Sequence, residues 1–369
     1  MHILFAGGGT AGHINPALAV AGYIKEKHPD AKISYIGTAK KLEAKLVPEK
    51  GYDFYSIEVS GFQRSLSPIS IAKNVKAAVN AVTASVKVRK LLRKLNPDLV
   101  VGTGGYVSGP VLREAAKMRF KTAIHEQNAY PGITNKMLSN SVDRVMLAMP
   151  EAKSRFKLNR EPFITGNPVR QELTSISKSE ARKKLGFDNR PVILSFGGSL
   201  GAQKINEAVT CLIKHHNGSG KYYHIHGTGK AGNAAMKEAL KDIKLAKEID
   251  VREYITDMDV CMAAADIVIC RAGAITLSEL TVCRKPSILI PSPYVAENHQ
   301  FHNAMTLKNA GAAEVIEEKE LSGDKLIEVV EEILSDFSRL SSMSENAAAV
   351  AIDDANERIY EVLTQLLAE

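Results

Sequence analysis

The chain has 369 residues, more than a single hydrophobic core usually supports, so we expect two domains. Its low aromatic content of 6%, with no tryptophan, argues against a stacking platform for single-stranded nucleic acid. No apolar run reaches the roughly 20 residues of a membrane-spanning helix. The net charge of +7 divides into +13 over residues 1–165 (25 Lys and Arg, 12 Asp and Glu) and −6 over the remainder (23 and 29), so one half is basic and the other acidic.

The first predicted element is a strand, Ile3 to Ala6, which runs directly into a glycine-rich loop from Gly7 to His13. A strand, a glycine loop and a helix N-terminus together form an arrangement whose backbone amides bind anions. The glycines also fit the dinucleotide fingerprint, which requires an acidic residue at the end of the second strand. The predicted second strand, Ile33 to Ile36, ends in Gly37-Thr38, and the next acidic residue is Glu43 in a predicted helix. We therefore do not favour nicotinamide or flavin binding.

His13 closes this first glycine loop, at or next to the start of a helix. A helix N-terminus favours the neutral imidazole, which can accept a proton, so His13 is a candidate general base. An equally open alternative is that His13 only hydrogen-bonds the loop or a phosphate.

A strongly basic stretch follows, because eight Lys and Arg and no acidic residue occur between Val59 and Pro97. Candidate partners are anionic lipid, nucleic acid or a phosphorylated acceptor. Within the stretch, apolar residues recur at helical spacing, which fits either a core-facing helix or a helix lying on anionic lipid. The apolar residues at this spacing are Ala72, Val75, Val79, Val82 and Val86.

Strands and helices continue to alternate through the first half, which indicates a parallel sheet covered by helices on both faces. Glycine-rich and polar segments follow two of the strands, namely Gly102 to Tyr106 and His125 to Asn128. Loops at the carboxyl ends of parallel strands share one edge of the sheet, where ligands bind. The further predicted strands of this half are Leu99 to Val101, Thr122 to Ile124 and Arg144 to Ala148.

The alternation resumes after a turn-rich crossing at Gly166 to Arg170, and Val192 to Ser195 leads into a second glycine loop, Gly197 to Ala202. We therefore expect a first domain over residues 1–165, a second over 166–341 and a helical end over 342–369. The further predicted strands of this half are Tyr222 to His226, Val251 to Ile255, Ile267 to Cys270 and Ser287 to Ile290.

Several motifs in the second half have plain structural interpretations. The segment from Gly227 to Lys230 lacks the rest of a P-loop and is predicted to be an exposed turn. Asp257-Met258-Asp259 could chelate a metal, but its place between a strand and a helix favours a capping carboxylate. His224-x-His226 and His299-x-x-His302 lack a cysteine or carboxylate at ligand spacing, so we interpret them as strand and loop histidines and expect no metal site.

Ser278-Glu279 lies in the first turns of a predicted helix entered through Gly273. A glutamate there can simply complement the helix dipole. It can also face the ligand and accept hydrogen bonds from the vicinal hydroxyls of a ribose. Both interpretations stay open.

Taken together, these motifs closely resemble the MurG family of glycosyltransferases and occur in the family's order along nearly the whole chain. The resemblance implies an α/β protein of GT-B type, in which two Rossmann-like, doubly wound parallel-sheet domains face a cleft. It also implies that the C-terminal helix crosses back to the first domain. The matching segments are 7–16, 102–110, 125–128, 166–170, 197–202, 254–258, 271–279 and 300–304.

The family moves N-acetylglucosamine from UDP-N-acetylglucosamine to the 4-hydroxyl of the muramyl sugar on undecaprenyl diphosphate, with inversion and without a required metal or cofactor. The resemblance thus implies the conversion of lipid I to lipid II in peptidoglycan synthesis, at the cytoplasmic face of the cell membrane. It implies donor contacts for Thr10, Ala11, Gly12, Asn128, Arg170, Ser199, Ile255, Ala274, Ile275, Thr276, Leu277, Ser278, Glu279 and Gln300. In particular, Ser199 would contact the donor phosphate, Ile255 uracil, Glu279 ribose, and Asn128 and Gln300 the transferred sugar.

On the acceptor side the resemblance implies His13 as the candidate base, together with Gly104, Gly105 and Tyr106. The basic stretch then becomes a peripheral contact with anionic inner-leaflet lipid, for which we name Ile69, Lys73, Val75, Lys76, Val79, Arg89 and Lys90, and no nucleic acid is expected. Two positions depart from the family: Ala11 often is Gly, and His299-Gln300 is two glutamines in some members. An epimerase of UDP-N-acetylglucosamine, or a nucleotide-sugar binding protein of related fold, is the alternative.

Overall fold

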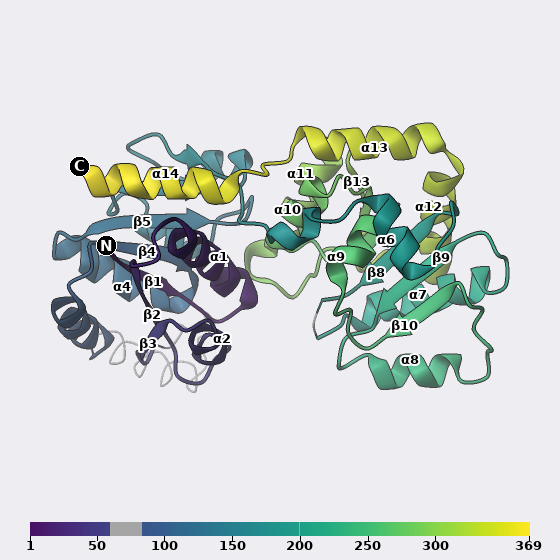
Figure 1. The fold of residues 1–369 in the computed structure, drawn as a ribbon, viewed down its shortest axis with the longest axis horizontal. Helices are drawn as coiled ribbons and strands as arrows, with labels where there is room; N and C mark the ends of the chain where they lie inside the picture. Colours follow the sequence, from purple (N-terminus) through teal and green to yellow (C-terminus); the bar gives the residue numbers. More distant parts are fainter. Residues whose placement is uncertain (60–82, 199) are drawn as a thin grey trace. The chain divides into compact units, whose positions relative to one another are not determined.

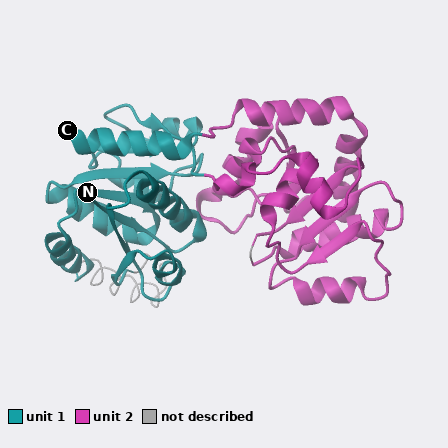
Figure 2. Ribbon diagram, viewed as in Figure 1, with its two compact units in different colours: residues 1–168, 354–369 teal, residues 169–353 magenta. Residues whose placement is uncertain are grey.

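The computed structural model describes residues 1–59, 83–198 and 200–369. The chain divides into two compact units (Figure 2). Unit 1 comprises Met1–Pro168 together with Asp354–Glu369, and unit 2 comprises Val169–Asp353.

Unit 1 is built on a seven-stranded parallel sheet in the order β3-β2-β1-β4-β5-β6-β7 (Figure 1). Its strands are β1 (His2–Gly7), β2 (Lys32–Gly37), β3 (Asp53–Ser56), β4 (Leu99–Gly104), β5 (Lys121–Glu126), β6 (Arg144–Leu147) and β7 (Phe163–Ile164). Its helices are α1 (Ala11–Lys27), α2 (Glu43–Glu49), residues 83–95, α4 (Gly105–Lys117), α5 (Ile133–Leu138), the 3-10 helix η1 (Pro150–Arg155) and α14 (Ala355–Ala368).

Both faces of this sheet are buried, because alternate side chains of each strand enter different cores. In β1, Ile3 and Phe5 pack in a core with residues of α1 and α14. Leu4 and Ala6 pack in the opposite core, with residues of α4 and of helix 83–95. The sheet is therefore doubly wound, as its continuous apolar strands predict.

Unit 2 repeats the plan with a six-stranded parallel sheet in the order β10-β9-β8-β11-β12-β13. Its strands are β8 (Val192–Phe196), β9 (Tyr223–Gly227), β10 (Ile249–Arg252), β11 (Ile267–Cys270), β12 (Ser287–Leu289) and β13 (Ala313–Val315). Its helices are η2 (Gln171–Thr174), α6 (Lys178–Leu185), α7 (Gln203–His216), α8 (Asn233–Leu240), α9 (Met258–Ala264), α10 (Ala274–Val282), η3 (Ala296–Asn298), α11 (His299–Asn309), α12 (Gly323–Ser335) and α13 (Phe337–Ala349).

The strand order places the glycine loops at corresponding points of the two sheets. In each sheet the order reverses beside the first strand, between β1 and β4 in unit 1 and between β8 and β11 in unit 2. Ligands of open parallel sheets bind at such switch points, beyond the carboxyl ends of the strands. The two Rossmann-like sheets expected from the sequence are confirmed.

The predicted single helix over residues 342–369 is wrong, because two helices occupy this end of the chain. Helix α13 belongs to unit 2 and ends at Ala349, and α14 begins at Ala355, directly after Asp353-Asp354. Aspartate favours the start of a helix over its interior, so this pair marks the break. Helix α14 packs on α1 in unit 1 through Ile359, Val362, Leu363 and Leu366 (Figure 1).

Other differences concern short elements. The strand predicted at Val251 to Ile255 is β10, Ile249–Arg252, and so begins and ends earlier. His299 and His302 lie in α11 instead of a loop. Strands β3, β7 and β13 were not predicted, because they have only two to four residues each, and β3 and β13 also contain charged residues.

Three buried histidines adjoin the strand that leads into the second glycine loop. Ser195 Oγ of β8 lies 2.7 Å from His224 Nε2 and 2.7 Å from His226 Nδ1, both on β9. His224 Nδ1 in turn lies 3.3 Å from Nε2 of His216 on α7. Burial lowers the pKa of His216 and of His226 to about 4, and that of His224 well below its usual value.

Lowering the pH from 7 to 5 is therefore expected to destabilise the protein. Below about pH 6.5 the unfolded chain binds protons at these histidines and the folded chain does not, so stability present at pH 7 is lost as the pH falls. His216 and His226 should each contribute about 2 kcal/mol to this loss. Urea unfolding at the two pH values measures it.

The matched variants are His226→Gln, which removes one buried imidazole, and His215→Gln, which removes an exposed neighbour that pairs with Glu331. The first should weaken the pH dependence. The second should retain most of it, because burial, the largest cause of the lowered pKa of His216, remains. If the stability of both variants depended equally on pH, the loss of stability could not be attributed to the buried histidines.

Candidate active site

The first glycine loop is shorter than the expected segment from Gly7 to His13, because α1 begins at Ala11, two residues before His13. Thr10 is the N-cap and its hydroxyl does not cap the helix; Ala11 and Gly12 are its first two residues, and all three are exposed. Because Ala11 already belongs to the helix, this position does not require the conformational freedom of glycine. His13 lies in the first turn and is half-buried.

A buried carboxylate that the sequence did not single out lies beneath this loop. Glu43 Oε2 accepts from the Gly9 amide at 3.2 Å, and Oε1 accepts from the Thr38 amide at 3.0 Å and its hydroxyl at 2.7 Å. A Cβ on Gly8 would lie 2.5 Å from Glu43 Oε1. Glu43 therefore ties the first glycine loop to the segment that follows β2, and its oxygens are occupied by these three donors.

The loop after β4 approaches the first glycine loop so closely that it requires glycine. Gly104 and Gly105 have φ of 103° and 78°. A Cβ on Gly105 would lie 2.2 Å from the Gly8 carbonyl oxygen, and one on Gly104 would lie 2.9 Å from His13 Nδ1. The structure thus brings Gly104, Gly105 and His13 together, while Tyr106 stays 67% exposed at the start of α4.

The loop after β5 is organised by Glu126, whose side chain is buried. Its Oε1 accepts from the Asn128 amide at 3.0 Å and from Asn128 Nδ2 at 3.1 Å. Its Oε2 accepts from the Gly132 amide at 3.0 Å and from Asn135 Nδ2 at 2.9 Å. Glu126 therefore fixes both the backbone and the side chain of Asn128. The next residue, Gln127, meets His13, with 3.2 Å between Gln127 Oε1 and His13 Nδ1.

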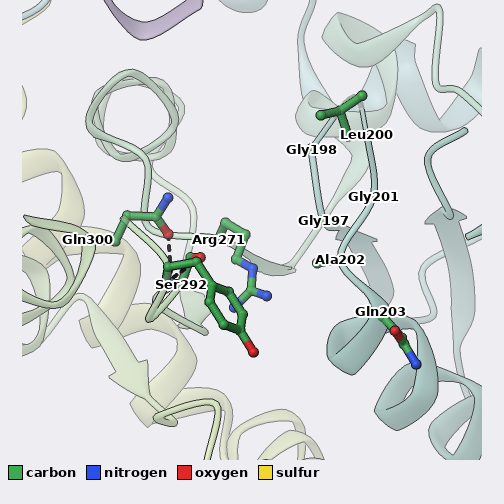
Figure 3. Close-up of a pocket in the computed structure, with 10 residues that line it drawn as sticks. Gly197, Gly198, Leu200, Gly201, Ala202, Gln203, Arg271, Ser292 and Gln300 are labelled. Atoms are coloured by element: carbon green, nitrogen blue, oxygen red, sulfur yellow. Dashed lines mark hydrogen bonds between the residues drawn. The ribbon is translucent and has the colours of Figure 1, made fainter. Parts of the chain in front are cut away.

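In unit 2 the second glycine loop forms one wall of a 460 Å³ pocket (Figure 3). Arg271 extends into the space between Gln300 and the loop. Its guanidinium donates to the carbonyls of Ile290 and Pro291 at 3.1 and 3.3 Å and pairs with Glu318. The lining residues are Gly197, Gly198, Leu200, Gly201, Ala202, Gln203, Arg271, Ser292, Tyr294 and Gln300.

Gln300 is the second residue of α11, and its Oε1 accepts a hydrogen bond from the Ser292 amide at 2.9 Å. The side chain is thereby held against the pocket wall with its amide nitrogen available for a ligand. Its neighbour His299 bonds instead to the Ala296 carbonyl, with 2.8 Å from Nδ1.

The predicted exposed turn at Gly227 to Lys230 is wrong, because Thr228 and Gly229 are buried against the second glycine loop. A Cβ on Gly201 would lie 2.3 Å from the Thr228 carbonyl oxygen. Ile255 is buried against Gly227, at the same edge of the sheet. Only a side-chain-free backbone allows these loops to approach so closely.

Glu279 pairs with Arg170, so two residues expected at the nucleotide contact each other. Arg170 Nε and Nη2 both lie 3.0 Å from Glu279 Oε1. Burial raises the pKa of Glu279, although Arg170 opposes that shift. Glu279 is the sixth residue of α10 and not in its first turn, so the helix-dipole interpretation is wrong. The other expected donor residues of this helix are Ala274, Ile275, Thr276, Leu277 and Ser278, and they form its first five positions.

The capping role predicted for Asp257 is also wrong. Asp257 occupies the N-cap of α9 without a side-chain cap, because its Oδ1 accepts from Arg252 Nη1 at 2.5 Å. A charge-assisted bond to a guanidinium outcompetes a bond to a backbone amide. Among the residues that the structure describes, no group of three His, Cys, Asp or Glu is arranged to hold a metal ion.

Some expected residues lie outside the described part of the chain. They are Ser199 on the second loop and Ile69, Lys73, Val75, Lys76 and Val79 in the basic stretch. Arg89 and Lys90 lie on helix 83–95, which packs on unit 1 through Ala84, Val88 and Leu92.

Arg89 already has a partner, because its Nε lies 2.5 Å from the buried Glu114 Oε2. Lys90 is exposed, as is Val86 at 49%. None of the helices described has a long enough apolar stretch to cross a membrane.

Comparison with known proteins matches both halves of the chain to domains of one glycosyltransferase family. Residues 3–147 match the glycosyltransferase family 28 N-terminal domain, and residues 192–359 match the C-terminal domain of that family. A protein of Acetivibrio thermocellus is 47% identical over 100% of this chain and 98% of its own length. It is named UDP-N-acetylglucosamine--N-acetylmuramyl-(pentapeptide) pyrophosphoryl-undecaprenol N-acetylglucosamine transferase, as is a protein of Caldanaerobacter subterraneus that is 44% identical over 98% of this chain and 99% of its own.

The chain belongs to the MurG family of glycosyltransferases. The crystal structure of Acinetobacter baumannii MurG agrees, with a TM-score of 0.81, 26% identity and 99% coverage of both chains. The GT-B fold is thereby confirmed. A UDP-GlcNAc 2-epimerase from Neisseria meningitidis has a TM-score of 0.66 at 14% identity over 99% of this chain and 100% of its own, a likeness of fold alone.

Within this MurG-family site, Gly105→Ala should impair both stability and turnover. The new Cβ must displace the Gly8 carbonyl in addition to straining a positive φ. Gly186→Ala is the matched control, because Gly186 has φ of 70° and its Cβ would meet nothing within 4 Å. The control should cost only backbone strain, about 1–2 kcal/mol.

Urea unfolding and initial rates of both variants measure the difference. If Gly105→Ala were no less stable than Gly186→Ala and equally active, the close approach of the two loops would be dispensable.

Proposed function

We propose that the chain transfers N-acetylglucosamine from UDP-N-acetylglucosamine to the 4-hydroxyl of the muramyl sugar of a lipid-linked muramyl pentapeptide, in peptidoglycan synthesis. The observation that carries this assignment is identity of 42–47% over essentially full length to relatives named for that reaction. Two features support the proposal. The pocket beside the second glycine loop suits the donor substrate, and the cluster of His13, Gly104 and Gly105 suits the acceptor substrate.

The donor binds in unit 2. The pocket presents the glycine loop, the N-terminus of α7 and the Arg271 guanidinium, which together suit a diphosphate. Ala202, the N-cap of α7, offers no side chain to the helix amides, which are then free for phosphate oxygens. Glu279 holds the ribose, Arg170 lies on the nucleotide, and Gln300 meets the transferred sugar.

Transfer is a direct displacement with inversion. The muramyl 4-oxygen attacks the anomeric carbon as the bond to the β-phosphate oxygen breaks, and UDP leaves with the bonding pair. The hydroxyl proton passes to His13. The donors at the second loop stabilise the charge that develops on UDP, the task that a metal performs elsewhere.

The reaction predicts that UDP is released only when a lipid-linked muramyl acceptor is present. EDTA should leave the rate unchanged, because protein groups hold the diphosphate. His13→Ala should lower turnover by roughly 10²- to 10⁴-fold, the usual contribution of one general base. Coupled detection of UDP, with the donor alone and with the acceptor, measures all three.

Isomerised sugar from donor alone would establish the epimerase instead. Metal-dependent rescue after EDTA would restore a metal role for Asp257 and Asp259. Full activity of His13→Ala would remove the base assignment while leaving the transferase function intact.

Peripheral binding at the cytoplasmic face of the cell membrane, through anionic lipid, completes the proposal. Helix 83–95 presents four exposed basic side chains beside the exposed Val86, which suits a surface of anionic headgroups. Arg89 does not belong to this set, because it neutralises the buried Glu114. The four basic residues are Lys87, Lys90, Arg93 and Lys94.

Reversal of these four charges to glutamate should weaken binding to anionic phospholipid vesicles at low salt by two to three orders of magnitude, at about 1 kcal/mol per residue. Vesicle co-sedimentation measures the change. The matched control reverses four exposed lysines of unit 2, and it should bind as the unchanged protein does. Equal binding by both variants would refute the membrane contact. The control lysines are Lys214, Lys221, Lys237 and Lys244.

A further inference from the structure

A chain of hydrogen bonds connects the His13 ring to the backbone at the end of unit 1. His13 Nδ1 lies 3.2 Å from Gln127 Oε1, Gln127 Nε2 lies 3.1 Å from His125 Nδ1, and His125 Nε2 lies 2.9 Å from the Gly166 carbonyl oxygen. Gln127 and His125 are only 1% and 2% exposed. Solvent therefore has little access to the two linking side chains.

Backbone carbonyls set the direction of every bond in this chain, because a carbonyl oxygen can only accept. Gln127 Nε2 lies 2.9 Å from the His125 carbonyl oxygen, so the amide nitrogen must be the atom on that side. Gln127 Oε1 then faces His13. Likewise His125 Nε2 must carry the hydrogen that it donates to Gly166, which leaves His125 Nδ1 to accept from Gln127.

The protonation of His125 agrees with this assignment. A cationic imidazole would carry hydrogens on both nitrogens and would direct one of them at the Gln127 amide hydrogens. Burial lowers the pKa of His125, which favours the neutral ring that the chain requires.

The direction of these hydrogen bonds also determines which nitrogen of His13 carries a hydrogen. Because Gln127 presents an oxygen, His13 Nδ1 must carry a hydrogen, and the lone pair of the neutral ring is on Nε2. When Nε2 accepts a proton, the bond from Nδ1 to Gln127 keeps its direction, so the ring need not turn during proton transfer. Glycine at position 104 leaves room for the ring in this position, since a Cβ there would lie 2.9 Å from Nδ1 and 3.0 Å from Cε1.

We propose that Gln127 and His125 are positioning residues that hold His13 as the Nδ1–H tautomer, with Nε2 as the atom that takes the proton of the acceptor hydroxyl. The proposal rests on the proposed function, in which His13 is the base. It assigns these two residues of the 125–128 segment to the chemistry, and Glu126 to the placement of Asn128.

Histidine ¹⁵N chemical shifts, read from long-range ¹H–¹⁵N correlations, test the tautomer without turnover. The His13 signals are identified by their loss in His13→Gln. In the unchanged protein with a neutral His13 ring, Nδ1 should be the protonated nitrogen. Gln127→Met, which removes the acceptor, should shift His13 towards the Nε2–H form. Gln127→Glu keeps an oxygen towards His13 and should retain the Nδ1–H form.

A double-mutant cycle tests the effect on catalysis. Gln127→Met should lower kcat at least about 10-fold, and by no more than the roughly 10²- to 10⁴-fold cost of losing the base, with little change in KM for UDP-N-acetylglucosamine. In the His13→Gln background the same change should have almost no further effect. Thr122→Val is the control, because Thr122 is buried on the same strand and bonds Asp143 instead of the chain to His13. It should lower stability and leave the tautomer and kcat unchanged.

An Nε2–H tautomer in the unchanged protein, or equal losses from Gln127→Met in both backgrounds, would overturn the positioning role. If His13→Gln were fully active while the Nδ1–H tautomer depended on Gln127, the base assignment of the proposed function would fail and the positioning of His13 would stand. The two failures are thus distinguishable.

Discussion

The unit-1 site depends on one steric constraint, the close approach of the loops that follow β1 and β4. The position of a Cβ on Gly105 lies 2.2 Å from the Gly8 carbonyl oxygen, so the loop after β4 has no room for a side chain at this residue. This contact brings the carboxyl end of β4 against the start of α1 and the ring of His13 against Gly104. The main effect of these glycines is to let the two backbones approach each other closely, and flexibility is secondary. This close approach determines where His13, the candidate base, lies.

Much of the fold could be predicted because its central strands are buried on both faces. β1, β2, β8 and β11 are mainly apolar and are followed by glycine or a polar loop, the pattern of buried parallel strands. The edge strands β3, β7 and β13 lacked this pattern, and the break between α13 and α14 depended on two aspartates inside an otherwise helical composition.

The site was predictable to the extent that it consists of local motifs. The sequence named both glycine loops and His13 as candidates, but it did not indicate the contacts that Glu43 and Gln127 make with them. Glu43 meets Gly9 34 positions away, and Gln127 meets His13 114 positions away, so no local spacing indicates either contact. Asp257 shows the converse, since a correct N-cap position did not reveal that Arg252 would take its carboxylate.

The two glycine loops share a geometry and differ in the charges around them. Each precedes a helix whose N-cap, Thr10 or Ala202, makes no side-chain cap, so each leaves helix amides for an external anion. A carboxylate, Glu43, occupies the underside of the first loop, while the Arg271 guanidinium faces the pocket beside the second. These charges favour the second loop over the first for the proposed diphosphate contact, although Glu318 offsets part of the charge of Arg271. The neutral, hydrogen-bonded groups around His13 suit a proton acceptor better than a phosphate. In the proposed function, side chains outside the glycine motifs therefore give different roles to two loops that the motifs alone do not distinguish.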